Sequence, residues 1–311
     1  MSLLTINNLS VQFETAGATV PVLDRIDFEV AAGDHIALIG ESGCGKTVLG
    51  MSVMRLLPPN ARITGAIRYA GSDLLQVAER EMQQIRGRGI ALISQNSVSS
   101  LNPVVRIGDQ IAESLSLHTQ YRGDDLRHEV IRLLAELGIE QPEESVQKFP
   151  HQFSGGMRER ILVAMALACN PDIIIADEPT TGLDALVKVQ ILRLLKKAMQ
   201  GRTLLLITHD LGTAFTLASR TAVMYAGEIL ECGPTSEVFS HPRHPYTQGL
   251  LASSPSAGFH PIPGLSPAPG QVPSGCRFCP RCSCAMDTCR SLHPHLKETG
   301  RGRRVRCFRY D

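Results

Sequence analysis

Short apolar runs alternate with longer amphipathic segments over the first 235 residues of the chain. Runs of four or five apolar residues have the length of strands that are buried on both faces of a sheet. Segments whose apolar residues recur three and four positions apart predict helices that cover those strands. The pattern therefore predicts an α/β fold with a largely buried central sheet. Its expected strands are Ile36–Ile39, Ile90–Ile93, Ile173–Ala176, Leu204–Thr208 and Ala222–Tyr225.

The same pattern divides the chain into three expected parts. Residues 1–235 form one large domain, and apolar residues at helical spacing between Leu126 and Leu137 predict a helical insert over about 96–160. Residues 236–275 are rich in Pro, Gly and His, which predicts a linker with little regular structure. Residues 276–311 hold a cluster of cysteines and are expected to form a small C-terminal domain.

Composition and charge narrow the classes of protein that fit. The chain has 311 residues and is 43% hydrophobic, so it can bury a sizeable core. Lys and Arg total 31 against 30 Asp and Glu, so no field of one sign would attract nucleic acid or an anionic membrane surface. No apolar stretch approaches the ~20 residues of a membrane-spanning helix. The start, MSLLTINNLS, lacks the basic and apolar regions of a secretory signal.

A phosphate-binding loop follows the first expected core strand. The sequence Gly-Glu-Ser-Gly-Cys-Gly-Lys-Thr fits the pattern G-x-x-x-x-G-K-[ST], between that strand and a helix expected over Val48–Leu56. Glycines allow successive backbone amides to point at phosphate groups. Lys46 is expected to bind the β- and γ-phosphates of ATP, and Thr47 to give Mg²⁺ an oxygen ligand. The residues expected to bind the nucleotide here are Gly40, Ser42, Gly43, Cys44, Gly45, Lys46 and Thr47.

Two adjacent carboxylates end another expected strand. Asp177 and Glu178 follow Ile173–Ala176, and neighbouring residues on a strand point in opposite directions, which predicts different roles. Asp177 is expected to orient the Mg²⁺ shell, and Glu178 to polarise the attacking water as a general base. More polar groups follow at Asp184 and His209. Ligands of open α/β sheets bind at the carboxyl ends of the strands, which favours a site over solvated acids.

The ordered set of motifs resembles the ATP-binding-cassette (ABC) family over about residues 3–235. The set comprises the loop at 40–47, Ser94-Gln95-Asn96, the signature Phe153-Ser154-Gly155-Gly156-Met157, the carboxylate pair, Asp184 and His209. The resemblance implies a P-loop NTPase (RecA-like) core with an antiparallel β subdomain and a helical insert.

In this family two cassettes enclose ATP, so the resemblance implies that Ser154, Gly155 and Gly156 contact the γ-phosphate bound by a partner cassette. It further implies that Phe13 stacks on adenine, although Phe13 also fits a strand core. Gln95 would bind Mg²⁺ or water, Asp184 would belong to the nucleotide site, and His209 would touch the γ-phosphate. Phe and Met stand where the family most often has Leu and Gln at the ends of the signature, which leaves the strength of the cassette contact open.

Further stretches are similar to the subfamily that powers import of peptides or nickel with a solute-binding protein. They are Ser99-Ser-Leu-Asn-Pro103, Pro150-His-Gln-Phe, His244-Pro-Tyr-Thr-Gln-Gly-Leu-Leu251 and the C-terminal cysteine pattern. The resemblance implies a second, related ATPase subunit, two transmembrane permeases and a periplasmic or extracellular solute-binding protein. It places the chain at the cytoplasmic face of the inner (plasma) membrane as a peripheral subunit.

Six of the nine cysteines lie between Cys276 and Cys307, with the spacing C-x2-C-x2-C-x-C-x4-C-x17-C. The subfamily pattern contains Cys276, Cys282, Cys289 and Cys307. In a reducing compartment such a cluster favours metal over disulfides. Four thiolates suit a [4Fe-4S] cluster or Zn²⁺, while small buried free thiols are the alternative.

The resulting hypothesis is a Mg-ATP-hydrolysing subunit that drives an importer of di- or oligopeptides. Import of nickel or a metallophore is the alternative cargo. A soluble ABC ATPase that acts on nucleic acid or ribosomes, and a complex that ATP merely switches, are rival classes. The chain has one cassette and no long coiled-coil insertion, and Lys46, Glu178 and His209 are all present, so both rivals are disfavoured.

Overall fold

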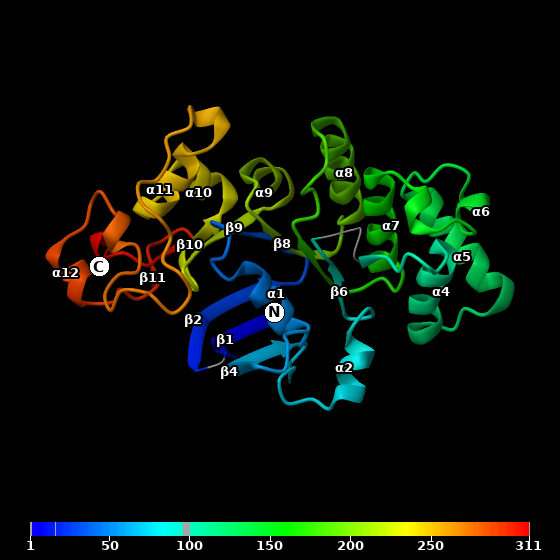
Figure 1. Ribbon diagram of the computed structural model, residues 1–311, viewed down its shortest axis with the longest axis horizontal. Coiled ribbons are helices and arrows are strands. Elements are labelled where there is room, and N and C mark those ends of the chain that lie inside the picture. Colours follow the sequence, from blue (N-terminus) through cyan, green and yellow to red (C-terminus); the bar gives the residue numbers. More distant parts are fainter. Residues whose placement is uncertain (1, 16, 96–99, 311) are drawn as a thin grey trace. The chain divides into compact units, whose positions relative to one another are not determined.

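The computed structural model describes residues 2–15, 17–95 and 100–310, and Figure 1 shows their arrangement. The chain forms two compact units. One contains Met1–Gln76 together with Leu206–Asp311, and the other contains Val77–Leu205. Within the described ranges, no helix is long and apolar enough to cross a membrane. Asn96 and Ser99, which belong to two of the motifs above, lie outside the described residues.

An antiparallel sheet opens the first unit. It has the order β2-β1-β4-β5 and consists of β1 (Ser2–Thr15), β2 (Ala18–Ala31), β4 (Ala61–Tyr69) and β5 (Ser72–Asp73). Apolar residues alternate with polar ones along β2, so that Ile26, Phe28 and Val30 are buried while their neighbours are exposed. The antiparallel β subdomain is therefore confirmed.

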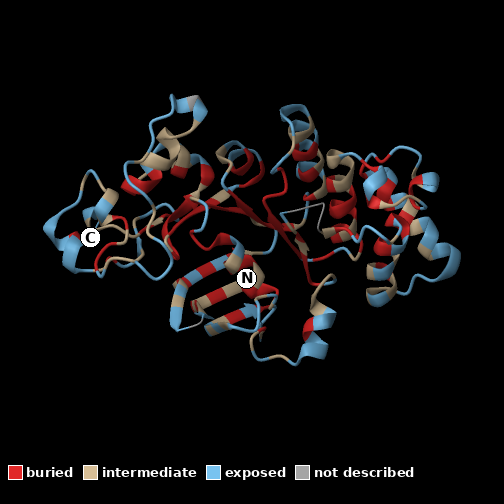
Figure 2. Ribbon diagram, viewed as in Figure 1, coloured by how far each residue is buried: buried red, intermediate tan, exposed pale blue. Residues whose placement is uncertain are grey.

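The first unit also contains a mixed parallel and antiparallel sheet. β3 (His35–Ile39) pairs in parallel with β9 (Arg220–Tyr225), which pairs antiparallel with β10 (Glu228–Pro234). β12 (Arg304–Val305) extends this sheet beyond β10, and β11 (Lys297–Glu298) pairs with β12. Figure 2 shows that the strands β3, β9 and β10 are mostly buried, and β3 and β9 contain two of the predicted apolar runs.

Short helices connect the strands of the first unit. α1 (Lys46–Val53) follows β3, and α9 (Leu211–Leu217) precedes β9. After β10 come α10 (Thr235–Ser240), α11 (Pro245–Ala252) and α12 (Asp287–Ser291). Single helical turns η2 to η4 complete the C-terminal part at Pro255–Ala257, Cys279–Arg281 and Phe308–Tyr310.

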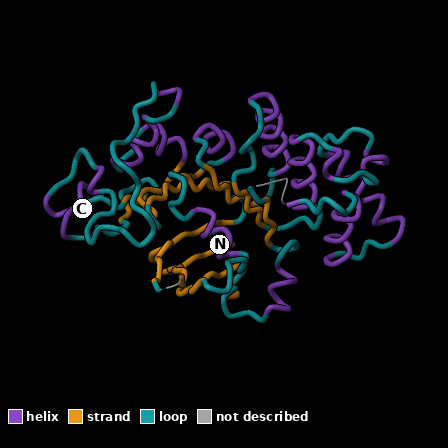
Figure 3. The backbone as a smooth tube through the Cα atoms, viewed as in Figure 1, coloured by secondary structure: helices purple, strands orange, loops and turns teal. Residues whose placement is uncertain are grey.

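The second unit is predominantly helical (Figure 3). α2 (Glu79–Ile85) leads into β6 (Ile90–Ile93), whose parallel partner is β7 (Ile173–Asp177). Between these strands lie α4 (Ile107–His118), α5 (Gly123–Glu136), α6 (Pro142–Ser145), the turn η1 (Pro150–Gln152) and α7 (Gly155–Leu167). α8 (Ala185–Ala198) follows β7, and β8 (Thr203–Thr208) carries the chain across the boundary between the units. The helical segment predicted before the signature is therefore present from α4 onwards.

The C-terminal part departs from its prediction in two respects. α10 and α11 form within and beside the stretch predicted to have little regular structure. A separate Cys-rich domain is not confirmed, because residues 276–311 belong to the same compact unit as the antiparallel sheet. The physical reason is that this segment packs on strands of the same unit: Val305 of β12 pairs with Glu231 of β10, and the buried ring of Phe278 lies 5.4 Å from that of Tyr225 in β9.

Candidate nucleotide-binding site

The phosphate-binding loop connects β3 to α1, as predicted. Gly40 has φ +154°, and a Cβ atom there would lie 2.1 Å from the carbonyl oxygen of Met224. A side chain at residue 40 would therefore displace the loop from β9. Ser42, Gly43 and Thr47 are exposed, whereas Cys44, Gly45 and Lys46 are buried. The loop thus presents small polar groups to solvent while its base is fixed against β9.

Lys46 is only 7% exposed, and carbonyl groups of the loop hold its ammonium group. Its Nζ donates hydrogen bonds to the carbonyl oxygens of Gly40 at 2.8 Å and Glu41 at 3.0 Å. Both bonds join the ammonium group to carbonyl oxygens and neither joins it to a carboxylate, so its positive charge stays at the loop. Such a cation, beside the backbone amides at the N-terminus of α1, suits a phosphate group.

Glu41 is a further residue of the site, and the sequence motif did not predict a role for it. Its carboxylate accepts hydrogen bonds from Arg281 Nη1 at 2.8 Å and Nη2 at 3.0 Å, and its backbone N–H donates to Tyr246 Oη at 2.9 Å. Burial would raise the pKa of Glu41, but hydrogen bonds from Arg281 and Ser266 and the charges of Arg281 and Lys46 hold it below its ordinary value. Tyr246 lies in the His-Pro-Tyr-Thr motif, which could have indicated a functional role for it. The motif does not indicate that its partner is Glu41.

The two predicted carboxylates lie at the end of β7 in the second unit. Asp177 is 6% exposed and Glu178 is 7% exposed. Glu178 has φ +52°, a left-handed conformation that is uncommon for a residue with a side chain. Its Oε2 atom accepts a hydrogen bond from Thr181 Oγ1 at 3.2 Å. The chain therefore leaves the strand at Glu178 through a strained turn, and a carboxylate is fixed there.

The signature residues form the start of α7. Ser154 is the N-cap, and its Oγ accepts a hydrogen bond from the backbone N–H of Met157 at 3.3 Å. Gly155 and Gly156 are the first residues of the helix, and a Cβ at Gly156 would lie 2.5 Å from Val187 of α8. Close packing of α7 on α8 therefore requires glycine at residue 156. The exposed hydroxyl and the first amides of a 13-residue helix can together bind an anion.

The remaining predicted residues lie at strand ends, at a helix start and within one strand. Asp184 is the N-cap of α8 and accepts hydrogen bonds from the N–H groups of Leu186 and Val187, each at 3.0 Å. His209 is exposed directly after β8, which excludes a buried core histidine. Gln95 is exposed just after β6, and Phe13 is half-buried in β1.

The structure therefore groups the predicted site residues in two sets. The first unit contains Phe13, the loop at 40–47 and His209, whereas the second contains Gln95, Ser154, Gly155, Gly156, Asp177, Glu178 and Asp184. Apart from Phe13, which lies within β1, the residues of both sets lie at or next to the ends of strands and helices.

The C-terminal cysteines do not form a metal site in the structure. Burial raises the pKa of the Cys276 thiol to about 12, and the neighbouring Cys289 and Cys307 thiols contribute to the same shift. Burial likewise raises the pKa of the Cys282 thiol, and the neighbouring Cys284, Cys307 and Cys289 thiols contribute to that shift, so these side chains lie near one another. Among the described residues, however, no group of three or more His, Cys, Asp or Glu side chains is arranged to hold a metal ion. The predicted Fe–S cluster or Zn²⁺ is therefore not supported by the described residues.

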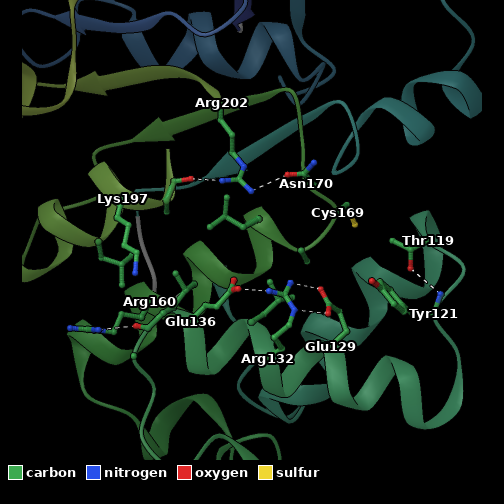
Figure 4. Close-up of a pocket in the computed structure, with 17 residues that line it drawn as sticks. Thr119, Tyr121, Glu129, Arg132, Glu136, Arg160, Cys169, Asn170, Lys197 and Arg202 are labelled. Atoms are coloured by element: carbon green, nitrogen blue, oxygen red, sulfur yellow. Dashed lines mark hydrogen bonds and ion pairs between the residues drawn. The ribbon is translucent and has the colours of Figure 1, made fainter. Parts of the chain in front are cut away.

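A cavity of about 740 Å³ lies within the second unit, away from the motif residues of that unit. Figure 4 shows that its walls come from α5, α7, α8 and the segments that follow α4 and α7. Two of the arginines in it bind other groups of the wall: Arg132 pairs with Glu129 and Glu136, and Arg202 donates a hydrogen bond to Asn170 at 2.9 Å. None of the predicted nucleotide-binding residues lines this cavity, so it is distinct from the candidate site.

Comparison with known proteins supports the family resemblance. Residues 23–181 match the family described as ABC transporter, and residues 230–289 match the one described as oligopeptide/dipeptide transporter, C-terminal region. The dipeptide transport ATP-binding protein DppD of Bacillus subtilis is 43% identical, with 99% of this chain and 95% of that protein covered. The oligopeptide transport ATP-binding protein AppD of the same organism is 40% identical, with 100% and 97% covered.

A solved structure shows the same fold. The ATP-binding cassette MJ0796, in a dimeric post-hydrolysis state bound to ADP and Pi, superposes with a TM-score of 0.66 at 24% identity. The match covers 75% of this chain and 98% of that one, which makes the cassette fold the shared part. Together with relatives that match nearly end to end at 40% identity or more, this fold shows that the chain belongs to the ATP-binding proteins of the ABC transporter family.

Proposed function

We propose that the chain is the ATP-hydrolysing subunit that powers an ABC importer of dipeptides or oligopeptides. The observation that carries the proposal is the match at residues 230–289 to the C-terminal region of oligopeptide/dipeptide transporters. This region lies outside the cassette that ABC proteins share, so it distinguishes one branch of the family. The relatives that match over the whole chain carry names of peptide transport or peptide import proteins.

ATP binds in this proposal through the loop at residues 40–47. The ammonium group of Lys46 moves from its carbonyl partners to the β- and γ-phosphates, and the amides of Gly43, Cys44 and Gly45 donate to the phosphate oxygens. Thr47 and Asp177 offer the hard oxygen atoms that Mg²⁺ prefers, and Gln95 would join them. Bound Mg²⁺ would neutralise charge on the phosphates. Phe13, half-buried on β1, has an exposed part that can stack on adenine.

Hydrolysis requires a base and a polar group beside the γ-phosphate. Glu178 lies in a strained turn at the end of β7 and accepts a hydrogen bond from Thr181, which supports a role for its carboxylate in taking a proton from the attacking water. His209 is exposed at the end of β8 and can donate to the γ-phosphate. The helix start at Ser154, Gly155 and Gly156 would bind the γ-phosphate held by a second cassette, and Asp184 would lie in the same interface.

Such a subunit works only in an assembly. A second ATPase subunit, related to this chain, supplies the facing cassette, and two permeases form the path through the membrane. A solute-binding protein delivers the peptide on the outer side. The chain is then a peripheral subunit on the cytoplasmic face of the membrane. No observation favours nickel as the cargo or nucleic acid as the partner.

The test is Glu178→Gln, which keeps the hydrogen-bonding side-chain oxygen and removes the base. We expect the ATPase rate of the assembled transporter to fall by about 10²- to 10⁴-fold while ATP binding remains. Uptake of a labelled dipeptide should be lost in cells whose single copy carries the change, and uptake of ⁶³Ni²⁺ should persist. Glu143→Gln, at an exposed position of α6, is the matched control in the same unit. Unchanged peptide uptake in the Glu178 variant would contradict the proposal.

A further inference from the structure

Two segments of the C-terminal part hold the nucleotide loop at a single residue, Glu41. Arg281, in the turn η3, binds both oxygen atoms of the Glu41 carboxylate at 2.8 and 3.0 Å. Tyr246, in α11, accepts the hydrogen bond of the Glu41 backbone N–H at 2.9 Å. The side chain and the backbone of one loop residue are thus fixed by groups more than 200 positions away in the sequence.

The Arg281 side of this contact is itself held firmly. Its side chain is 7% exposed, its Nε donates to the carbonyl oxygen of Pro263 at 3.0 Å, and its guanidinium lies 5.7 Å from the centre of the Tyr225 ring. A bidentate, charge-assisted pair with a carboxylate is among the stronger hydrogen-bonded contacts in proteins. Because these contacts hold the Arg281 side chain in place, Arg281 fixes the position of Glu41.

The Tyr246 side is equally rigid. The ring of Tyr246 is fully buried, with its centre 4.6 Å from that of Tyr225 and 5.4 Å from that of Phe278. His244 caps the helix that carries it, by accepting the Tyr246 N–H at Nδ1 over 3.0 Å. The hydroxyl oxygen of Tyr246 consequently stands at a fixed point beside the loop.

Fixing Glu41 also fixes the charge that the loop offers to phosphate. The carbonyl group of Glu41 is one of the two that accept hydrogen bonds from Lys46 Nζ. A loop that is held in one conformation before ATP arrives loses less conformational freedom on binding, and this saving appears as affinity. Without the contact, ATP binding would have to order Glu41 and its neighbours first.

We propose that Arg281 and Tyr246 are positioning residues for the nucleotide loop, which act through Glu41 and set the affinity of the cassette for ATP. The C-terminal part thereby controls ATP binding by this subunit. The proposal rests on the ATP site proposed above and adds to it a function for a region outside the cassette.

The experiment measures the Kd of Mg-ATP for the full-length chain by titration calorimetry, together with the KM and kcat of ATP hydrolysis in the assembled transporter. Arg281→Gln removes the charged pair, and Tyr246→Phe removes only the hydroxyl. We expect each to raise Kd and KM by about tenfold, the order of one hydrogen bond, while kcat changes less than twofold. A role in stability alone would lower the active fraction and hence the apparent kcat, without a change in KM.

Arg277→Gln is the matched control. Arg277 lies four positions earlier in the same segment and pairs with two other acids of the first unit, Asp24 and Glu228, instead of with the loop. Its loss should leave Kd within twofold of the wild type. If Arg277→Gln raises Kd as much as Arg281→Gln does, the effect is general to the segment and the positioning role is wrong.

A double variant, Glu41→Ala with Arg281→Gln, separates the pair from other effects. Because both changes remove the same contact, the double variant should have about the same Kd for ATP as whichever single variant binds ATP more weakly. If the fold-changes in Kd of the two single variants multiply in the double variant, or if Arg281→Gln binds ATP more tightly than the wild type, the proposal is wrong. A wild-type chain that fails to bind ATP would instead refute the ATP site itself, whereas normal wild-type binding with an unchanged Arg281 variant refutes only the positioning role.

Discussion

His244 is a histidine that is 1% exposed and whose Nδ1 accepts a backbone hydrogen bond, so it is held in its neutral form. Burial lowers its pKa from the ordinary value of 6.5 to about 3. The side chain therefore supports α11 and, through it, Tyr246, without carrying charge. A neutral imidazole that accepts at one nitrogen is a helix cap that acid can remove.

This state predicts a pH-dependent stability. Between pH 6.5 and 3 the unfolded chain binds a proton at residue 244 that the folded chain does not, so the free energy of unfolding decreases as the pH falls through this window. The slope from this residue is about 1.4 kcal/mol per pH unit at its steepest. His244→Asn keeps an acceptor for the cap and should flatten the curve. Urea unfolding at pH 7.5, 6.5 and 5.5 measures the difference, and parallel curves for both proteins would contradict the assignment.

At the residue scale, sequence alone predicts the groups that belong to one contiguous motif. Lys46, Thr47, Asp177 and Glu178 are set by their own flanking strands and turns, which the local pattern contains. The contact between Glu41 and Arg281 spans 240 residues, and no local pattern encodes the partner of an arginine in a tail. The left-handed backbone of Glu178 was also beyond prediction, because a glutamate gives no signal for positive φ.

At the element scale, Asp184 shows that a motif residue can also be a structural one. Its carboxylate caps α8 through two backbone N–H groups. Asp184→Ala should lower the free energy of unfolding by about 1 kcal/mol, whereas Asp184→Asn should retain most of the cap. Chemical unfolding of the two variants and the wild type measures this. If the alanine variant is as stable as the asparagine variant, the cap contributes nothing.

The two Asp184 variants also separate an effect on stability from an effect on catalysis. An asparagine variant with normal stability and a reduced ATPase rate would assign the carboxylate a role in the ATP cycle, because only its charge has been removed. A normal ATPase rate in the asparagine variant would mean that capping α8 is the only function of Asp184.

Elements with a strong local pattern were predicted well. The run Ile90–Ile93 coincides with β6, and the expected strands at 36–39 and 222–225 lie within β3 and β9. α11 was missed because the stretch that leads into it, HPRHPY, is rich in Pro and His, which is typical of a linker. Its start nevertheless follows a known rule: Pro245 occupies the first turn, where its missing N–H costs nothing, and His244 provides the cap.

At the scale of the whole molecule, the C-terminal residues complete a sheet rather than form a body of their own. β12 pairs with β10, and Arg303 forms a buried ion pair with Glu231, whose carboxylate also accepts the N–H groups of Arg243 and His244. Both side chains of the pair are at most 2% exposed. Sequence could not show this arrangement, since the cysteine cluster suggested a segment with its own metal.

The ion pair gives a prediction for the cohesion of the first unit. Arg303→Met leaves the carboxylate of Glu231 buried without its cation, and should lower the free energy of unfolding by about 3 kcal/mol. Adding Glu231→Gln removes the uncompensated charge and should recover more than half of the loss. Urea unfolding of the three proteins at neutral pH measures both effects. A double variant as unstable as Arg303→Met would mean that lost packing, and not charge, is the cause.

The long sequence interval between Glu41 and Arg281 also has a consequence in time. A ribosome that adds about 5–20 residues per second needs roughly 10 to 50 s to make the 240 residues between the loop and its arginine. Through that interval the nascent loop exists without one of the groups that position it. A subunit still under synthesis should therefore hold ATP weakly, and full affinity should arise only when the C-terminal part has left the ribosome and packed.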